Sequence, residues 1–439
     1  MQQQISKVNV IGGGLAGCEC ALRLLSEGFL VDMYEMRPKR RTEAHNTDSL
    51  AELVCSNSLK SEEAETSSGL LKAELDILDC ELLKIARRCR VPSGSALSVD
   101  RQKFSQEVEQ TLLKFPSFKL IREEVCELDD TPTVIATGPL TSPSMAKTVG
   151  ELTGRDRLYF YDAIAPIVDF DSIDMTKAYF GGRYGKGGDD YLNLPMQRDE
   201  YELFYRELVG ATSTILHDFE KRELFDGCMP IEEMAKRGSD TMRFGPLKPI
   251  GLRHPETGEK AYAVVQLRKE NLEGNCFNLV GFQTNLTYGE QKRVFSLIPA
   301  LKNAEFIRYG NMHRNTYINS PDVLTETFRL KGERKIYIAG QLSGVEGYVE
   351  SIMSGLIAGI SLSRELSGKP ALTPSQNTIT GALMRYISSC SSAFQPMNSN
   401  FGLLPEIKNI RDKKERKQAY YARAVQDMQD FKETLSQEN

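Results

Sequence analysis

A glycine turn close to the N-terminus constrains the fold of this chain more than any other feature. The apolar run from Lys7 to Ile11 leads into a turn and a helix-like run, and the turn consists of Gly12, Gly13, Gly14, Leu15, Ala16 and Gly17. The first glycine permits the turn, the second lets the backbone approach a pyrophosphate, and the third allows close packing of helix on strand. Phosphate oxygens then meet N–H groups at the helix N-terminus. The pattern predicts a Rossmann-type dinucleotide-binding fold.

A second strand-like run supplies the acidic residue that such a fold uses. Phe29 to Glu35 ends in a carboxylate 18 residues after Gly17. This is close to the spacing at which an acid accepts hydrogen bonds from an adenosine ribose. A glycine turn that merely joins a strand to a helix is the weaker alternative, because strand, turn, helix and acid occur together. We therefore expect the turn and Glu35 to contact a dinucleotide.

Composition bounds the class of protein. The 439 residues are 40% hydrophobic and 26% charged, which is typical of a folded chain of more than one unit. The net charge of -5 argues against binding nucleic acid by overall charge but leaves a local basic patch open. No apolar run reaches the ~20 residues that span a bilayer, and the N-terminus shows no signal-peptide pattern. Nine cysteines without CxxC spacing favour reduced thiols, so we expect a cytoplasmic protein without a metal site.

Two later segments favour FAD over NAD, since both cofactors use the N-terminal turn. The apolar run from Thr133 to Gly138 ends in Ala-Thr-Gly and resembles the second nucleotide motif of many flavoproteins. Residues 335–359, which include Gly340, resemble the segment in which those proteins run a strand past the flavin and begin a helix there. A glycine-rich strand-to-helix junction is the alternative for this segment alone. Together the segments indicate FAD, with contacts from Gly138 and Gly340.

The return of the C-terminal segment to the first sheet would make the nucleotide-binding unit discontinuous. We expect an α/β fold in which a Rossmann-type FAD-binding domain, residues 1–185 and 326–439, is interrupted by an α+β insertion domain, residues 186–325. The glycine-rich stretch 181–191 is interpreted as the flexible crossover. Residues 406–437 combine charge with periodic apolar residues and are expected to form a surface helix.

Two cysteines lie in loops suited to chemistry. Cys228 stands in Phe-Asp-Gly-Cys-Met-Pro, where Gly227 lets the backbone come close to a ligand. Cys55 follows the second predicted strand, and Asn57 and Lys60 nearby offer donors and positive charge. Each of the two could act as a nucleophile, and each could equally fill space in the core.

Six segments together resemble one family. They are VCSNSLKS, FDGCMP, FGPLKPIGL, LVGFQTNLTYGEQ, RYGNMHRNTYINSP and GQLSGVEGYVES. They are similar to segments of the folate- and FAD-dependent tRNA (uracil-5-)-methyltransferases, and the resemblance runs from the glycine turn to about Gly359. It implies a flavoprotein that takes a methylene group from methylenetetrahydrofolate and, with NAD(P)H, makes 5-methyluridine in the T-loop of tRNA.

The resemblance also implies roles for single residues. Uracil is a poor nucleophile at C5, and thiolate addition at C6 generates an enolate that attacks there. By resemblance Cys228 is that thiolate, Cys55 is a base or assisting thiol, and reduced FAD is both carbon carrier and reductant. Tyr348 is placed where an aromatic ring could cover a pterin stacked on the flavin. His313 and Arg314 are further candidate contacts, although a core tyrosine and a surface basic pair are equally open alternatives.

The RNA-binding surface and the substrate are the least determined features. Basic residues available for phosphates are Lys248, Arg253, Arg268, Lys269, Lys292, Arg293 and Arg314. The same chemistry on ribosomal RNA is one alternative, since only the docking surface would differ. A small-molecule FAD/NAD(P)H oxidoreductase is a second, and a flavin-bearing RNA-binding scaffold without turnover is a third.

Overall fold

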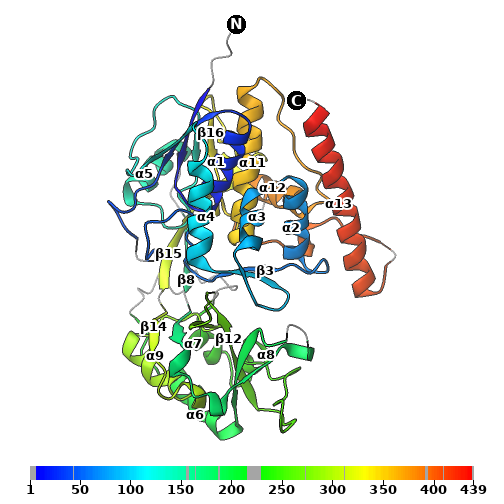
Figure 1. Cartoon of the computed structure of the whole chain (residues 1–439). Helices are drawn as coiled ribbons and strands as arrows, with labels where there is room; N and C mark the ends of the chain where they lie inside the picture. Colours follow the sequence, from blue (N-terminus) through cyan, green and yellow to red (C-terminus); the bar gives the residue numbers. More distant parts are fainter. Residues whose placement is uncertain are drawn as a thin grey trace.

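The chain folds into two units that are stacked end to end, with both termini on the same unit (Figure 1). The computed structural model describes residues 6–42, 44–154, 158–163, 165–185, 188–214, 229–271, 273–310, 312–390, 394–408 and 410–437, with the backbone alone for 158–163 and 312–314. The unit that carries the termini is called the upper unit, and the other is called the lower unit.

A five-stranded parallel sheet forms the centre of the upper unit, with the order β16-β7-β1-β2-β6. Its strands are β1 (Lys7–Ile11), β2 (Leu30–Tyr34), β6 (Phe118–Ile121), β7 (Thr133–Ile135) and β16 (Ile336–Ile338). β1 lies in the middle and is buried from Val8 to Ile11, because helices cover both faces of a parallel sheet. The parallel order confirms the predicted α/β fold with a Rossmann-type sheet.

Helices from both ends of the chain cover this sheet. They are α1 (Leu15–Ser26), α3 (Glu81–Arg88), α4 (Arg101–Leu113), α5 (Pro143–Thr153) and α11 (Tyr348–Leu366). α1 and α11 cross closely at Gly355, where an added Cβ would lie 2.1 Å from the carbonyl oxygen of Ala16. The C-terminal segment is therefore an integral part of the nucleotide-binding unit.

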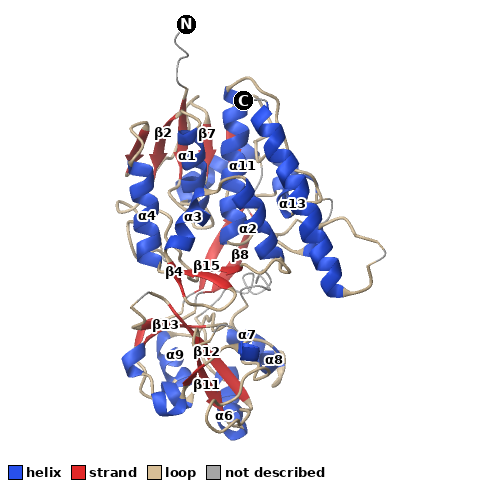
Figure 2. Ribbon diagram, turned by 45° about the vertical axis from the view of Figure 1, so that its right-hand side comes forward, coloured by secondary structure: helices blue, strands red, loops and turns tan. Residues whose placement is uncertain are grey.

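A second helical layer lies beside α11 in the upper unit (Figure 2). It contains α2 (Ser67–Ile77), α12 (Ile379–Ser389) and α13 (Lys413–Gln437), and α10 (Ser320–Val323) packs on α12. A small antiparallel sheet of β3 (Ser58–Ser61), β5 (Ala96–Val99) and β4 (Arg90–Val91) lies at the lower end of this unit. The predicted C-terminal helix, residues 406–437, is confirmed as α13, but the helix begins at Lys413 and residues 406–408 and 410–412 precede it without helical structure. Across the described ranges, no helix combines the length and the apolar character that crossing a membrane requires.

The lower unit is an α+β unit with its own core. Its six-stranded antiparallel sheet has the order β10-β11-β12-β13-β9-β14. The strands are β9 (Ile167–Asp169), β10 (Tyr179–Phe180), β11 (Tyr191–Met196), β12 (Ala263–Lys269), β13 (Cys276–Leu279) and β14 (Phe306–Arg308). The helices are α6 (Arg198–Val209), α7 (Ile231–Lys236), α8 (Thr241–Phe244) and α9 (Tyr288–Phe295). Its buried apolar side chains come from residues 165–304.

Two strands connect the units. β8 (Leu158–Ala163) and β15 (Met312–Tyr317) form an antiparallel pair between the two larger sheets (Figure 1). The glycine-rich stretch 181–191 instead leads from β10 to β11 within the lower sheet, so its interpretation as the crossover is wrong. We infer that the units meet at β8 and β15, which would move the predicted domain limits at 185 and 325 toward these strands.

Gly355→Ala tests whether the helix crossing sets the stability of the upper unit. The added methyl group would force α1 and α11 apart, so we expect a loss of about 1–3 kcal/mol in the free energy of unfolding. Gly289→Ala in α9 is the matched control, because a Cβ there would meet nothing within 4 Å and alanine favours a helix. Urea unfolding measures both variants. An equal free energy of unfolding for the two would contradict the role of this crossing.

Candidate functional site

A cavity opens at the carboxyl ends of β1, β2, β7 and β16, where open α/β sheets bind ligands. It encloses about 1010 Å³ of space, part of it open to solvent. Of the residues predicted to bind a cofactor, those in its wall are Gly12, Gly13, Gly14, Leu15, Ala16, Glu35, Gly138, Gly340 and Tyr348.

The glycine turn has the geometry that a pyrophosphate requires. Gly12 has a φ of +106°, and an added Cβ there would lie 2.4 Å from the carbonyl oxygen of Ala136. A Cβ on Gly17, which lies under the turn, would come within 1.9 Å of the Gly12 carbonyl oxygen. Gly14 is the N-cap of α1 and carries no capping side chain, and a Cβ there would meet nothing within 4 Å. The open space at this helix N-terminus fits an anionic group.

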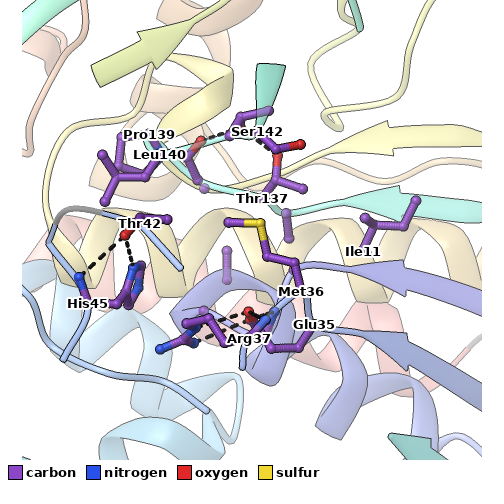
Figure 3. A pocket seen from close by; sticks show the side chains of 18 of the residues that line it. Ile11, Glu35, Met36, Arg37, Thr42, His45, Thr137, Pro139, Leu140 and Ser142 are labelled. Atoms are coloured by element: carbon purple, nitrogen blue, oxygen red, sulfur yellow. Dashed lines mark hydrogen bonds and ion pairs between the residues drawn. The ribbon is translucent and has the colours of Figure 1, made fainter. Parts of the chain in front are cut away.

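Glu35 holds the turn in place through its carboxylate. Its Oε2 accepts a hydrogen bond from the Gly13 N–H at 3.0 Å, and its Oε1 accepts one from Arg37 Nε at 3.0 Å (Figure 3). Burial acts to raise the pKa of Glu35, but hydrogen bonds from Arg37 and Gly13 and the charge of Arg37 lower it below its ordinary value. The carboxylate is therefore ionised, and its remaining lone pairs suit ribose hydroxyls.

Several wall residues escaped the sequence analysis. Arg37 is 2% exposed and also donates to Glu52 at 2.9 Å. Thr42 and His45 contact each other at 2.7 Å on the wall of the cavity (Figure 3). Arg37 could have been predicted as the partner of Glu35, because it stands two residues later and a buried carboxylate requires a partner. The loop that carries Thr42 and His45 has no comparable pattern.

Tyr348 and Cys55 meet at one end of this cavity. Tyr348 is the first residue of α11 and lines the cavity beside Val54. Its hydroxyl oxygen accepts hydrogen bonds from the N–H groups of Cys55 at 2.7 Å and Ser56 at 3.1 Å. Burial, and then the nearby Cys55, raise the pKa of Tyr348, so the phenol is neutral and retains its proton. The structure thus joins two predicted site residues that lie 293 positions apart.

Two arginines lie in the electrostatic environment of one carboxylate next to this loop, and Arg101 is the one that pairs with it. Arg101 Nε lies 2.7 Å from Glu270 Oε2, and Arg101 Nη1 donates to the Leu53 carbonyl oxygen. Arg308 comes from β14, where one extra residue against β9 forms a bulge that redirects the strand. The Nε and Nη2 groups of Arg308 are buried and have no hydrogen-bond partner among the described residues. The donor set therefore fits an oxygen with negative charge.

Arg308 is charged at neutral pH despite its burial. Burial lowers the pKa of Arg308 to about 10, the charge of Arg101 adds to this lowering, and Glu270 opposes it. Cys55 and Tyr348 also contribute to the electrostatic environment of Arg308. No sequence pattern predicts that Arg308 lies in the same environment as Arg101 and Cys55. These residues come from two units and from distant parts of the chain.

Some predicted RNA contacts have structural roles instead. Arg268 is 7% exposed and donates to Asn57 Oδ1 at 3.0 Å and to Ser56 Oγ at 2.8 Å, so it supports the Cys55 loop and is not available to phosphates. Arg293 pairs with Glu207 at 2.6 Å and with Glu290 at 2.8 Å.

Part of the predicted site lies outside the described residues. Cys228 falls there, as do the side chains of His313 and Arg314. Among the residues that are described, no group of three or more His, Cys, Asp or Glu side chains is placed to hold a metal ion.

Comparison with known proteins connects this geometry to a family. The family described as Glucose inhibited division protein A matches residues 7–370. A protein of Natranaerobius thermophilus named methylenetetrahydrofolate--tRNA-(uracil-5-)-methyltransferase TrmFO is 54% identical over 427 residues, 97% of this chain and 99% of that protein. The protein of that name from Bacillus subtilis is 50% identical over 437 residues, 99% of this chain and 100% of that protein. The chain belongs to the TrmFO family.

Membership of the TrmFO family confirms the resemblance that the sequence motifs indicate. A solved structure of Aquifex aeolicus GidA, in the form I crystal, has a TM-score of 0.70 and 16% identity, and the match covers 98% of this chain and 76% of that chain. At this identity the likeness concerns the fold. The glycine turn, the parallel sheet and the returning C-terminal segment are thus features of a fold that this TrmFO chain shares with GidA.

Gly14→Val tests the turn as a cofactor site without straining the backbone, since Gly14 has a φ of -78°. The larger side chain would enter the open space before α1, so we expect at least ~10-fold weaker FAD binding. Flavin absorbance of the purified protein measures the effect, and Gly289→Val is the control. Normal FAD content in Gly14→Val, with both variants folded, would rule out a pyrophosphate at this turn.

Proposed function

We propose that this chain methylates C5 of a uridine in the T-loop of tRNA. Methylenetetrahydrofolate would be the carbon donor, and NAD(P)H would reduce FAD. The observation that carries the proposal is identity of 50–54% over nearly the whole chain with proteins named methylenetetrahydrofolate--tRNA-(uracil-5-)-methyltransferase. The cavity supports it, because its glycine turn and its carboxylate suit a dinucleotide.

FAD would be held by residues from both ends of the chain. Gly14 and the N-terminus of α1 would receive the pyrophosphate, Glu35 would accept the ribose hydroxyls, and Gly138 and Gly340 would let the backbone approach the cofactor. When bound, FAD supplies the redox chemistry and a carrier for the one-carbon unit. Tyr348, at the far end of the cavity, would contact the ring system.

The cysteines would activate the uracil ring. In the proposed reaction the Cys228 thiolate bonds to C6, and the electron pair of the C5–C6 double bond moves toward O4. The new bond at C5 forms as the one-carbon unit separates from the nitrogen that carries it. The C5 proton then leaves, a hydride from reduced FAD would complete the methyl group, and the bond between sulfur and C6 breaks. Cys55, held by Tyr348 at the edge of the cavity, is the proposed base or assisting thiol for that proton.

Arg308 is suited to the negative charge on the ring. Its Nε and Nη2 groups have no partner among the described residues, and its guanidinium lies in the same electrostatic environment as Cys55. We propose that it donates a hydrogen bond to the uracil oxygen that becomes negative after thiolate addition. Arg101 would remain with Glu270 and hold the Cys55 loop through the Leu53 carbonyl.

The cytosol is the proposed compartment. Six described cysteines are free thiols, and a reducing compartment keeps thiols in this state. They are Cys18, Cys20, Cys80, Cys89, Cys126 and Cys276.

Cysteine replacement tests the reaction directly. Purified protein is incubated with methylenetetrahydrofolate, NADPH and unmodified tRNA, and nucleosides are analysed by mass spectrometry. We expect 5-methyluridine from the wild type and from Cys126→Ala, whose cysteine is exposed, and less than about 1% of it from Cys228→Ala and Cys55→Ala. Full product from Cys228→Ala would refute its nucleophilic role. Absence of product from the wild type, with FAD bound and NADPH oxidised, would refute the tRNA assignment.

Arg308→Met tests the proposed oxygen contact. Loss of one donor to a developing oxyanion costs about 10²–10³ in kcat, so we expect a fall of that size with unchanged FAD content and tRNA affinity. Lys302→Met, an exposed residue of the same unit, serves as control. Arg308→Lys keeps the charge without the planar fork and is expected to recover part of the rate. Wild-type kcat in Arg308→Met would exclude the contact.

A further inference from the structure

The N-terminal end of α13 carries an unusual concentration of positive charge. Residues 406–417 contain three acids, Glu406, Asp412 and Glu415, and six basic residues, which are Lys408, Arg411, Lys413, Lys414, Arg416 and Lys417. We call these six residues the basic end of α13. The whole chain has a net charge of -5, so this segment departs from the balance of the protein.

The basic residues at the start of α13 are arranged against its helix dipole. An α-helix has partial positive charge at its N-terminus, where acids stabilise it, and partial negative charge at its C-terminus, where bases stabilise it. Asp412 Oδ1 already caps this terminus, because it accepts hydrogen bonds from the N–H groups of Lys414 at 2.9 Å and Glu415 at 2.8 Å, whereas the last turn holds no basic residue. Helix stability therefore does not explain the basic side chains. An external polyanion would, because it gains from their charge.

The basic side chains are available to a partner. Lys408, Arg411, Lys413 and Lys414 are exposed. Within the described ranges, the basic end forms a single ion pair with an acid, between Lys414 and Glu65 at 3.7 Å. Surface pairs of this kind contribute little. With six basic residues against three acids, residues 406–417 keep a net positive charge of three.

The rest of α13 fixes the basic end to the upper unit. Tyr420 stacks on Phe401 with ring centroids 5.6 Å apart, and Gln418 donates to Glu65 at 3.2 Å. Further along, Ala424, Met428, Phe431 and Leu435 are buried. The helical part of the basic end, which begins at Lys413, is thus anchored to the upper unit, and this reduces the entropy cost of binding.

The position of the basic end relates it to the site. Glu65 lies in the loop between β3 and α2, and β3 begins three residues after Cys55. In Figure 1 the N-terminal end of α13 lies at the level of the junction between the units, whereas its C-terminal end lies near the top. A large ligand bound there would extend toward the junction, where Tyr348 accepts a hydrogen bond from the Cys55 N–H and Arg308 comes from β14 of the lower unit.

We propose that the basic end of α13 is a docking surface for the phosphate backbone of tRNA. The inference rests on the proposed function and adds a place where the RNA is held while a base is drawn into the cleft. RNA is the partner that the charge favours, because its backbone presents closely spaced phosphates that basic side chains neutralise with release of counterions. Contacts of this kind position a nucleic acid without reading its sequence.

A charge-matched pair of variants tests the surface. The first is the triple variant Lys408→Gln, Arg411→Gln and Lys413→Gln. The control, Lys114→Gln, Lys119→Gln and Lys335→Gln, removes the same charge from exposed residues at the amino ends of β6 and β16, the opposite end of the sheet. Filter binding of unmodified tRNA is measured over a series of salt concentrations, and FAD content and NADPH oxidation without tRNA are measured for each protein.

The first triple variant is expected to bind tRNA at least ~10-fold more weakly, with a salt slope reduced by about 2. The control is expected to keep the wild-type Kd and slope, and both should retain FAD and NADPH oxidation. Wild-type tRNA affinity and slope in the first variant would overturn the proposal. The proposal would also be overturned if the first variant kept its tRNA affinity but lost binding to phosphatidylserine vesicles. That result would assign the surface to a membrane.

The binding assay separates this proposal from the proposed function. If the wild type makes no 5-methyluridine but binds tRNA through the basic end, the reaction fails and the docking surface stands. If product forms and the first variant binds tRNA like the wild type, the docking surface alone fails.

Discussion

The rest of the structure depends on the close crossing of α1 and α11. Gly355 brings α11 against the Ala16 carbonyl, and this contact sets the start of α11 opposite the glycine turn. Tyr348 and Gly14 then line the same cavity. Since the two helices come from opposite ends of the chain, the cavity forms only after the C-terminal segment has packed on the first sheet. Cofactor binding is thus coupled to a contact of long sequence separation, which is slow to form.

The junction between the units contains a second constraint, an excess of buried positive charge. Arg101 pairs with Glu270, whose charge also opposes the lowering of the pKa of Arg308. The buried Nε and Nη2 groups of Arg308 have no hydrogen-bond partner among the described residues. Such groups cost free energy, so stability alone does not account for them. A site that must stabilise a developing negative charge benefits from donors that are already desolvated and oriented. The bulge in β14 contributes to this arrangement because it changes the direction in which Arg308 points.

Sequence reasoning succeeded where the signal was local. The glycine turn, Glu35 and the segments around Gly138 and Gly340 are short patterns with one physical explanation each, and the structure places them around one cavity. The prediction that residues 181–191 cross between the units was wrong, since they connect β10 to β11. A high glycine content indicates a flexible backbone but does not show which strands it connects. Arg308 could not be predicted, since its environment arises from tertiary contacts between two units. Cys55 was predicted from its loop and from family resemblance, and Tyr348 from the resemblance alone, whereas the hydrogen bond between them was not predicted.

The distribution of charge explains how an acidic protein can act on RNA. Attraction between exposed charges decays within a Debye length of about 8 Å at physiological ionic strength. A phosphate at the basic end of α13 therefore responds mainly to the local excess of lysine and arginine rather than to the net charge of -5. Arg308 and Arg101 lie in a buried environment that salt screens much less. Docking and chemistry thus use two separate positive regions, and ionic strength should weaken the first far more than the second.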